Sequence, residues 1–323
     1  MQEPVLNTVA LAEIDATDLL FSLNPVSPDP ALVASVAAIG LAQPLRLQKR
    51  LDHRFRIVSG FQRFAAARAA GLESLPAFVY PNTTDLLQLY EWVLAEKSYA
   101  KPLNALQASC AITRLRTDFS RSDEEIIRRF FPLMRLAPNP RLLSLYAPLQ
   151  RLELPLQLLL LQDELSIEIA AALAARSAQE QICFHDVMQT LRLGKNRQRE
   201  FWLLLTDIER MQKTSFSQLL GQAPLGPVLA EPSLTPSQKS DKLKLALMHL
   251  RYPAYSAALD RYEKILQRAK LPPEIHLRPA PYFASDQFQV DFSFRSAKEL
   301  KQRLKVLQTM LDQGLADELM DLV

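Results

Sequence analysis

The hydrophobic positions of the N-terminal third follow short strand and helix patterns in turn. Apolar runs predict strands over 8–14, 44–51, 54–59 and 75–80. Two segments with helical spacing, 31–39 and 62–70, lie between them, and they end at Gly40 and Gly71. Asp29-Pro30 supplies an N-cap and a first-turn proline for the first of these helices. This part of the chain is predicted to be a small α/β domain.

From about residue 85 to 220 the apolar spacing is helical throughout. Ser122 precedes three acidic residues, which is typical of a capped helix start. Prolines then divide the chain into short helices; they are Pro132, Pro138, Pro140, Pro148 and Pro155. Short helices with tight breaks are typical of helix-turn-helix units, although ordinary helical bundles also contain them.

The C-terminal third begins with a change in composition. Residues 221–240 contain four prolines together with glycine, serine and threonine, which predicts a linker. Helical patterns follow over 241–250 and 254–269, then an alternating strand pattern over 287–294 and an amphipathic helix over 297–311. We therefore expect a predominantly helical α+β fold. Its predicted parts are an N-terminal domain (1–84), a helical, helix-turn-helix-like domain (85–220), a proline-rich linker (221–240) and a C-terminal α+β module (241–323).

Composition narrows the classes of protein that fit this pattern. The chain is 48% hydrophobic and 23% charged, as expected of a folded protein, and its net charge is only +3. Contact with nucleic acid would therefore depend on local basic patches. Cys110 and Cys183 lie in apolar helical patterns and are expected to be buried thiols, and the four scattered histidines do not have metal-site spacing. We find no secretory signal and no membrane span, so we expect a cytoplasmic protein with no membrane partner.

The stretch "RIVSGFQRFAAARAAG" at 56–71 is the clearest candidate site. It predicts a strand that turns through Gly60 into a helix, and such a turn directs free backbone N–H groups and the positive end of the helix dipole at one point. Arg63 would add its guanidinium to an anion site there. The alternative is a structural role, in which Arg63 pairs with a carboxylate and packs on Phe64.

Several motifs in the same order resemble the ParB-like family, whose founding members partition chromosomes and plasmids. They are Asn24-Pro25, "AIGLAQPL" at 38–45, the stretch at 56–71 and "LPAFVY" at 75–80. Farther along, "AEKSYAKPLNALQA" keeps Glu96, Leu103 and Asn104, and "LSIEIAAALAA" at 165–175 resembles the helix that follows the family's helix-turn-helix region. The resemblance implies a ParB/sulfiredoxin-like N-terminal domain followed by a DNA-associated helical domain in a bacterial protein.

The resemblance also implies a site for CTP with magnesium. Gly60, Phe61 and Arg63 would face the phosphates, Gln43 and Pro44 would line the base pocket, and Glu96 would hold the metal ion or remain a solvated carboxylate. The motifs are degenerate, because Phe61-Gln62 replaces the family's Glu-Arg, and Lys97 and Ala100 replace an Asn and an Arg. One arginine and one carboxylate remain for a triphosphate that needs more compensation. We predict no catalytic residue and no resident metal site, and leave enzymatic activity open.

Two basic clusters are candidates for contact with DNA phosphates. The first contains Arg128, Arg129, Arg135 and Arg141, and the second contains Arg192, Lys195, Arg197 and Arg199. The stretch aligned with a recognition helix, 139–155, is rich in leucine and contains Pro148, so we expect a break there. Its side chains are predicted to be core or interface rather than base-reading; they are Leu142, Leu143, Leu145 and Leu149.

Three functions remain open from the sequence. The first is a ParB-like DNA-associated protein in chromosome or plasmid partitioning or transcription, located at the nucleoid. The second is a CTP-dependent switch or enzyme that uses Gly60 and Arg63. The third is a scaffold without enzymatic activity. In each case the C-terminal module is a candidate for forming a homo-oligomer.

Overall fold

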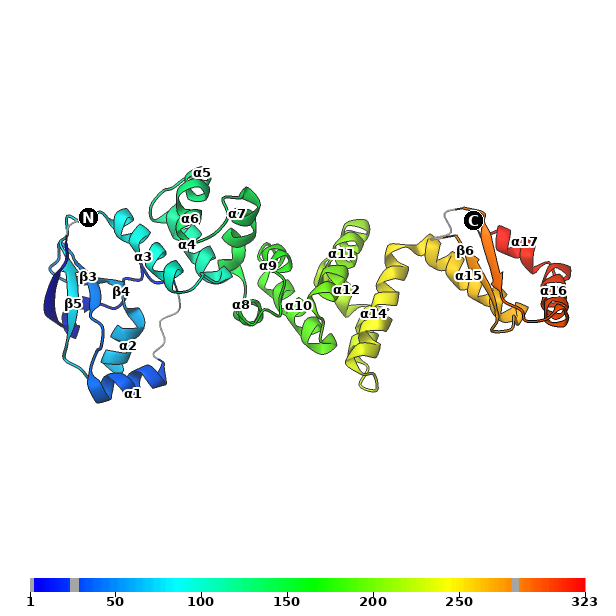
Figure 1. The fold of residues 1–323 in the computed structure, drawn as a ribbon, viewed down its shortest axis with the longest axis horizontal. Helices are drawn as coiled ribbons and strands as arrows, with labels where there is room; N and C mark the ends of the chain where they lie inside the picture. Colours follow the sequence, from blue (N-terminus) through cyan, green and yellow to red (C-terminus); the bar gives the residue numbers. More distant parts are fainter. Residues whose placement is uncertain (1–2, 24–28, 281–284, 323) are drawn as a thin grey trace. The chain divides into compact units, whose positions relative to one another are not determined.

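The computed structural model describes residues 3–23, 29–280 and 285–322 (Figure 1). The chain divides into two compact units, Met1–His185 and Asp186–Val323, and helices predominate in both. The expected α+β, predominantly helical fold is therefore confirmed. The Asn24-Pro25 motif lies outside the described residues.

A five-stranded mixed sheet forms the N-terminal domain, with strand order β1-β5-β3-β4-β2. Its strands are β1 (Val5–Ala10), β2 (Ile14–Asp15), β3 (Leu45–Lys49), β4 (Phe55–Ser59) and β5 (Ser74–Tyr80). β3 and β4 pair in antiparallel fashion and confirm the strands predicted over 44–51 and 54–59. The single strand predicted over 8–14 is wrong. The 3₁₀ turn η1 (Leu11–Glu13) divides it, because β1 pairs with β5 at one edge while β2 pairs with β4 at the other.

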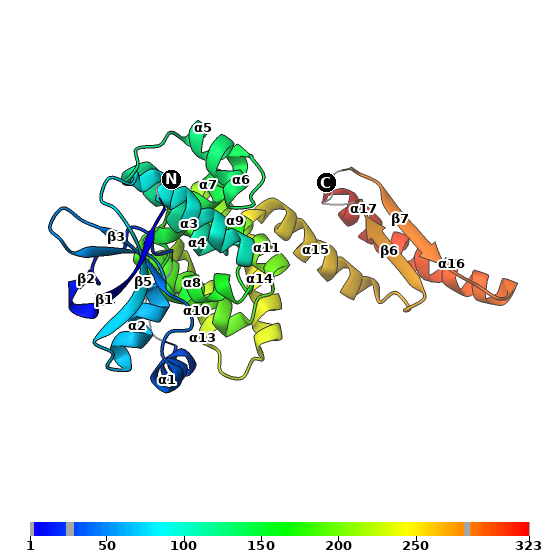
Figure 2. The same ribbon diagram turned by 60° about the vertical axis from the view of Figure 1, so that its left-hand side comes forward.

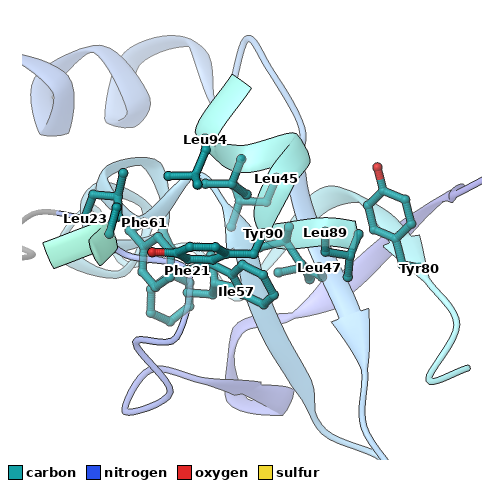
Figure 3. Close-up of a cluster of buried hydrophobic side chains, with 14 of the residues drawn as sticks. Phe21, Leu23, Leu45, Leu47, Ile57, Phe61, Tyr80, Leu89, Tyr90 and Leu94 are labelled. Carbon is teal, nitrogen blue, oxygen red and sulfur yellow. The ribbon is translucent and has the colours of Figure 1, made fainter. Parts of the chain in front are cut away.

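Three helices complete this domain: α1 (Pro30–Ile39), α2 (Phe61–Ala69) and α3 (Leu86–Ala100). α1 starts as predicted, because Asp29 Oδ1 accepts a hydrogen bond of 2.9 Å from the Ala31 N–H. α1 packs against α2 (Figure 2). In the core, Tyr90 of α3 lies among side chains from β3 and β4 and beside Phe21, with 6.0 Å between the two ring centroids (Figure 3). This packing holds the start of α2 and the body of α3 on one sheet.

Short helices make up the rest of the first unit. They are α4 (Ala105–Thr117), α5 (Asp123–Glu125), η2 (Ile126–Phe130), α6 (Phe131–Leu133), α7 (Pro140–Tyr146), η3 (Ala147–Arg151), α8 (Leu154–Leu161), α9 (Ile167–Leu173) and α10 (Ala178–Leu191), the last of which runs on into the second unit. α5, η2 and α6 are consecutive, and η2 is a π-helical turn in which the Phe131 N–H bonds to the Ile126 carbonyl. Pro132 explains the π-helical turn, because proline has no N–H to donate and its ring clashes with a regular α-helical turn before it.

The second unit is helical at first. Its helices up to residue 269 are α11 (Lys195–Gln212), α12 (Phe216–Gly221), α13 (Leu225–Ala230), α14 (Pro236–Arg251) and α15 (Pro253–Ala269). The prediction of a linker over 221–240 is wrong, because α13 lies within it and Leu225 is buried. Thr235 and Gln238 form a capping box, and Pro236 occupies the first turn of α14. The proline there initiates a helix, as its fixed φ permits.

The chain ends in an α+β module. β6 (Ile275–Pro279) and β7 (Phe288–Phe292) form an antiparallel pair, and α16 (Ala297–Asp312) and α17 (Leu315–Met320) follow. Met310, Leu315 and Leu319 pack with Tyr262 and Ile265 of α15 in a small core. The predicted strand over 287–294 and helix over 297–311 are confirmed, whereas the sequence patterns did not indicate β6. None of the described helices is long and apolar enough to cross a membrane.

Candidate phosphate site and basic surfaces

Gly60 forms the junction between β4 and α2. Its φ of 108° and ψ of 23° lie in a region that other residues rarely adopt. A Cβ atom at this position would lie 2.9 Å from Leu45 Cγ and 3.3 Å from Arg63 Nη2. The Phe64 N–H is bonded to the Gly60 carbonyl at 2.9 Å, as the helix begins. Glycine therefore permits the turn and also allows the Arg63 guanidinium to fold back over it.

The Arg63 guanidinium joins α2 to the loop before β3. Its Nη1 donates hydrogen bonds to the carbonyl oxygens of Gln43, at 3.0 Å, and Pro44, at 2.8 Å. The structural alternative of pairing with a carboxylate is therefore wrong about the partner, because these acceptors are main-chain oxygens. Burial lowers the pKa of Arg63, Glu96 opposes this shift and Arg46 adds to it. The structure thus brings Gln43, Pro44, Gly60 and Arg63 together.

Phe61 and Glu96 have different positions relative to this turn. The Phe61 side chain is buried in the hydrophobic core, so only its main chain is available to a ligand at the start of α2. Glu96 Oε2, from α3, accepts a hydrogen bond of 3.0 Å from Ser59 Oγ at the end of β4. The carboxylate is therefore held next to the junction.

Two further cations belong to the site and were not included in the sequence prediction. Arg46 Nη1 donates to Tyr80 Oη at 2.7 Å, and the Arg46 guanidinium carbon lies 4.2 Å from the centroid of the Trp92 ring. Burial lowers the pKa of Lys97, which interacts electrostatically with Glu96 and Arg63. Arg63 therefore has two other cations in its electrostatic surroundings.

Glu96 is the carboxylate next to this turn that a magnesium ion would use. Magnesium is bound through oxygen ligands, usually one or two carboxylates together with substrate phosphates. Glu96 is hydrogen-bonded by Ser59 and interacts with Arg63 and Lys97. Among the described residues, no group of three or more His, Cys, Asp or Glu could hold a metal ion. That finding does not bear on an ion held by one carboxylate and phosphates, so the role of Glu96 in holding magnesium stays a prediction.

The first basic cluster is divided by its neighbours. Arg129 pairs with Glu91 at 2.5 Å and with Glu125 at 3.5 Å, and Arg135 lies over the Tyr99 ring at 5.6 Å from its centroid. Arg128 and Arg141 are exposed, and their side chains form no ion pair with the residues that the structure describes. Arg135 is exposed as well, and a contact with an aromatic ring leaves its charge in place, so the positive charge that no described carboxylate offsets is at Arg128, Arg135 and Arg141.

The second basic cluster lies in the other unit, around the start of α11. Arg197 Nη1 donates to Ser240 Oγ at 3.2 Å and lies 3.8 Å from Asp241, so this arginine ties α11 to α14. Lys195 and Arg199 also have interaction partners, whereas Arg192 is exposed just before the helix. This cluster therefore has a structural role in part.

The leucine-rich segment after α6 is largely packed. Leu143 and Leu149 are buried, Leu142 and Leu145 are partly buried, and η3 interrupts the helix at Pro148 as expected. The helix-turn-helix assignment itself stays a prediction.

The N-terminal part of the chain is a small mixed sheet with a cationic strand-to-helix turn between β4 and α2. Residues 29–92 match the ParB N-terminal domain family. This part of the chain is therefore ParB-like, as its motifs indicated.

Known proteins resemble parts of the chain. Stage 0 sporulation protein J of Bacillus subtilis is 31% identical over 156 residues, which are 46% of this chain and 54% of that protein. The chain spans between 31% and 54% of the length of the curated relatives considered. Two crystal structures of a C-terminally truncated ParB from Caulobacter crescentus are also similar. The complex with the centromeric parS site has 18% identity and a TM-score of 0.35, and covers 60% of this chain and 97% of that one. The complex with CTP-gamma-S has 21% identity and a TM-score of 0.24, and covers 56% and 97%.

Proposed function

We propose that this chain is a DNA-associated protein of the ParB type that acts in chromosome or plasmid partitioning. One observation carries the proposal: the 156-residue similarity to stage 0 sporulation protein J. That length exceeds the predicted N-terminal domain, so the similarity must include part of the helical region. The proposal therefore concerns both domains.

DNA contact would occur through the exposed arginines of the helical region. Arg128 lies on the π-helical turn η2 and Arg141 on the first turn of α7, and both are exposed. Arginines in such positions bind backbone phosphates, which position a protein on the duplex without specifying a sequence. The packed leucines of α7 and η3 offer little hydrogen bonding to base edges. We therefore expect binding that depends on salt more than on sequence.

Reversing both arginines tests this surface. We expect Arg128→Glu with Arg141→Glu to weaken binding to generic duplex DNA roughly 10- to 100-fold at low salt and to reduce the salt slope by about two. Fluorescence anisotropy over a salt series measures both quantities. Arg261→Glu is the matched control, because it reverses an exposed arginine of α15 in the second unit. Absence of binding by the unmodified protein at low salt would overturn the proposal.

A nucleotide-dependent switch is the second candidate function, and the three cations at the β4–α2 junction favour it. Arg63 lies in the first turn of α2, Arg46 and Lys97 interact electrostatically with it, and phosphate groups are stabilised at a helix N-terminus. CTP is the nucleoside triphosphate that the family resemblance suggests. In this proposal, nucleotide binding to the N-terminal domain would alter DNA association by the helical domain.

A thermal screen of nucleoside triphosphates tests the switch. We expect CTP to raise the melting temperature, because a ligand present at 100 times its Kd stabilises the folded state by about 2.7 kcal/mol. The other nucleoside triphosphates serve as comparisons. An unchanged midpoint with every nucleotide, combined with normal DNA binding, would exclude the switch and leave the DNA-associated function. Absence of both nucleotide binding and DNA binding would favour the third function, a scaffold without enzymatic activity.

A further inference from the structure

We infer that the N-terminal domain has a second ligand site, a cavity beside α2 that binds a small molecule with one carboxylate and an apolar body. The cavity lies between α2, β4 and the segment that follows β2. Gln43, Arg63 and Glu96 of the candidate phosphate site do not line it. The inference is therefore separate from nucleotide and DNA binding, and its failure would leave the proposed function unchanged.

The cavity has the size and the lining of a small-molecule site. Its volume is about 530 Å³, and Arg68 is the one charged side chain among the described residues that line it. Ile57, Phe61 and Phe64 form its apolar floor and are at most 7% exposed, so the hydrophobic core holds them in place. Small-molecule sites are typically clefts of about 300–1,000 Å³ that are mostly apolar and contain a few polar groups.

The wall at Leu19 is held by polar contacts on both sides. Asp18 pairs with Arg56 of β4 at 2.5 Å. Arg114 of α4 donates hydrogen bonds to the carbonyl oxygens of Leu19 and Leu20. The Leu19 side chain lines the cavity and is 44% exposed, so it offers apolar surface to a ligand. A wall that is already ordered reduces the entropy cost of binding.

Arg68 gives the cavity its preference for an anion. It lies in the last turn of α2 and is exposed, and its guanidinium forms no hydrogen bond or ion pair with the residues that the structure describes. Asp15 is paired with Arg50 at 2.7 Å. Asp18 is paired with Arg56, so neither of these acids occupies Arg68.

The charge at Arg68 favours a carboxylate over other anionic groups. A guanidinium binds a carboxylate through two parallel hydrogen bonds, and the two single charges balance. A phosphate monoester carries about 1.5 to 2 negative charges, which one arginine does not balance. A ligand with its apolar body over Phe61 and Phe64 and its carboxylate at Arg68 therefore matches both parts of the cavity.

Calorimetric titration of the full chain with decanoate, below its micelle concentration, tests the inference. Decanol and acetate are the comparison ligands, because each lacks one of the two features. We expect decanoate to bind more tightly than decanol, and acetate not to bind detectably. Shortening decanoate to nonanoate and octanoate should raise the Kd roughly fourfold per methylene, because each methylene removes apolar surface from the cavity.

Two substitutions locate the binding site. Arg68→Gln should weaken decanoate binding about three- to tenfold and leave decanol binding unchanged, because it removes the charge alone. Ala65→Leu should weaken the binding of both ligands, because the larger side chain occupies part of the cavity. Arg141→Gln is the matched control, since it removes an exposed arginine of α7 that does not line the cavity. Its affinity should equal that of the unmodified protein.

The possible results separate the site from its charge preference. Absence of decanoate binding, or unchanged affinity in Ala65→Leu with a normal melting temperature, would overturn the site. Equal affinity for decanoate and decanol would overturn the preference for a carboxylate. An Arg68→Gln variant that binds decanoate like the unmodified protein would also overturn it, and this exposed substitution does not alter the core.

Discussion

Gly60→Ala is expected to destabilise the N-terminal domain by about 2–6 kcal/mol. Two costs add at this position. An alanine at φ 108° pays a backbone penalty of about 1–3 kcal/mol. Its Cβ would also lie 2.9 Å from Leu45 Cγ, a fully buried core atom, and overpacking of this kind costs about 1–3 kcal/mol. The displaced Arg63 guanidinium would lose its bonds to the Gln43 and Pro44 carbonyls as well.

Urea denaturation followed by Trp92 fluorescence measures this effect. A Trp202→Phe background makes the signal specific for the N-terminal domain, because the chain has only these two tryptophans. Gly71→Ala is the matched control, since Gly71 has a φ of 76° and open space around the added Cβ. We expect the control to cost about 1 kcal/mol. Equal losses for the two variants would show that the contact with Leu45 and Arg63 does not matter.

Local signals account for the elements that the sequence predicted well. Asp29 as N-cap and Pro30 in the first turn, followed by helical apolar spacing, identify the start of α1 without any contact to distant residues. The division of the first strand is different in kind. Residues 5–10 and 14–15 join opposite edges of the sheet, so the break depends on β5 and β4, which lie far along the chain. The sequence did not predict α13 for a similar reason. A helix bounded by prolines and a proline-rich linker have the same local pattern, and only the burial of Leu225 in the folded chain distinguishes them.

The candidate site shows the same division. Gly60 and Arg63 lie three residues apart in one motif, so the sequence predicts that they are close in space. Arg46 and Lys97 reach the site only through the packing of β3, β5 and α3, and no local pattern marks them. Carboxylates distant in sequence also change the basic clusters, because Glu91 pairs with Arg129 and Asp241 lies near Arg197. Counting charges along the sequence therefore underestimates the positive charge near Arg63. It overestimates the positive charge that the two basic clusters offer to DNA.

The C-terminal module has an apolar stripe on α16 that the module covers only in part. Leu300, Leu304, Leu307 and Leu311 are spaced so that they share one helix face. Leu304 is 50% exposed and Leu311 is 56% exposed. Met310 is the one buried residue of α16, all of which the structure describes. We propose that a second copy of the chain covers this stripe, as the expected homo-oligomer requires.

Leu304→Glu with Leu311→Glu is expected to convert such a dimer to a monomer. Each leucine contributes about 1.5 kcal/mol or more when it is buried, so four leucines in a symmetric dimer contribute about 6 kcal/mol. Their loss would raise the dissociation constant on the order of 10⁴-fold. Light scattering after size-exclusion chromatography at micromolar concentration measures the change. Leu245→Glu on α14, where the leucine is 59% exposed, is the control and should leave the dimer intact. A monomeric unmodified protein would exclude self-association under these conditions. A dimer that survives both substitutions would place the interface elsewhere, since charged side chains could not be buried between two such helices.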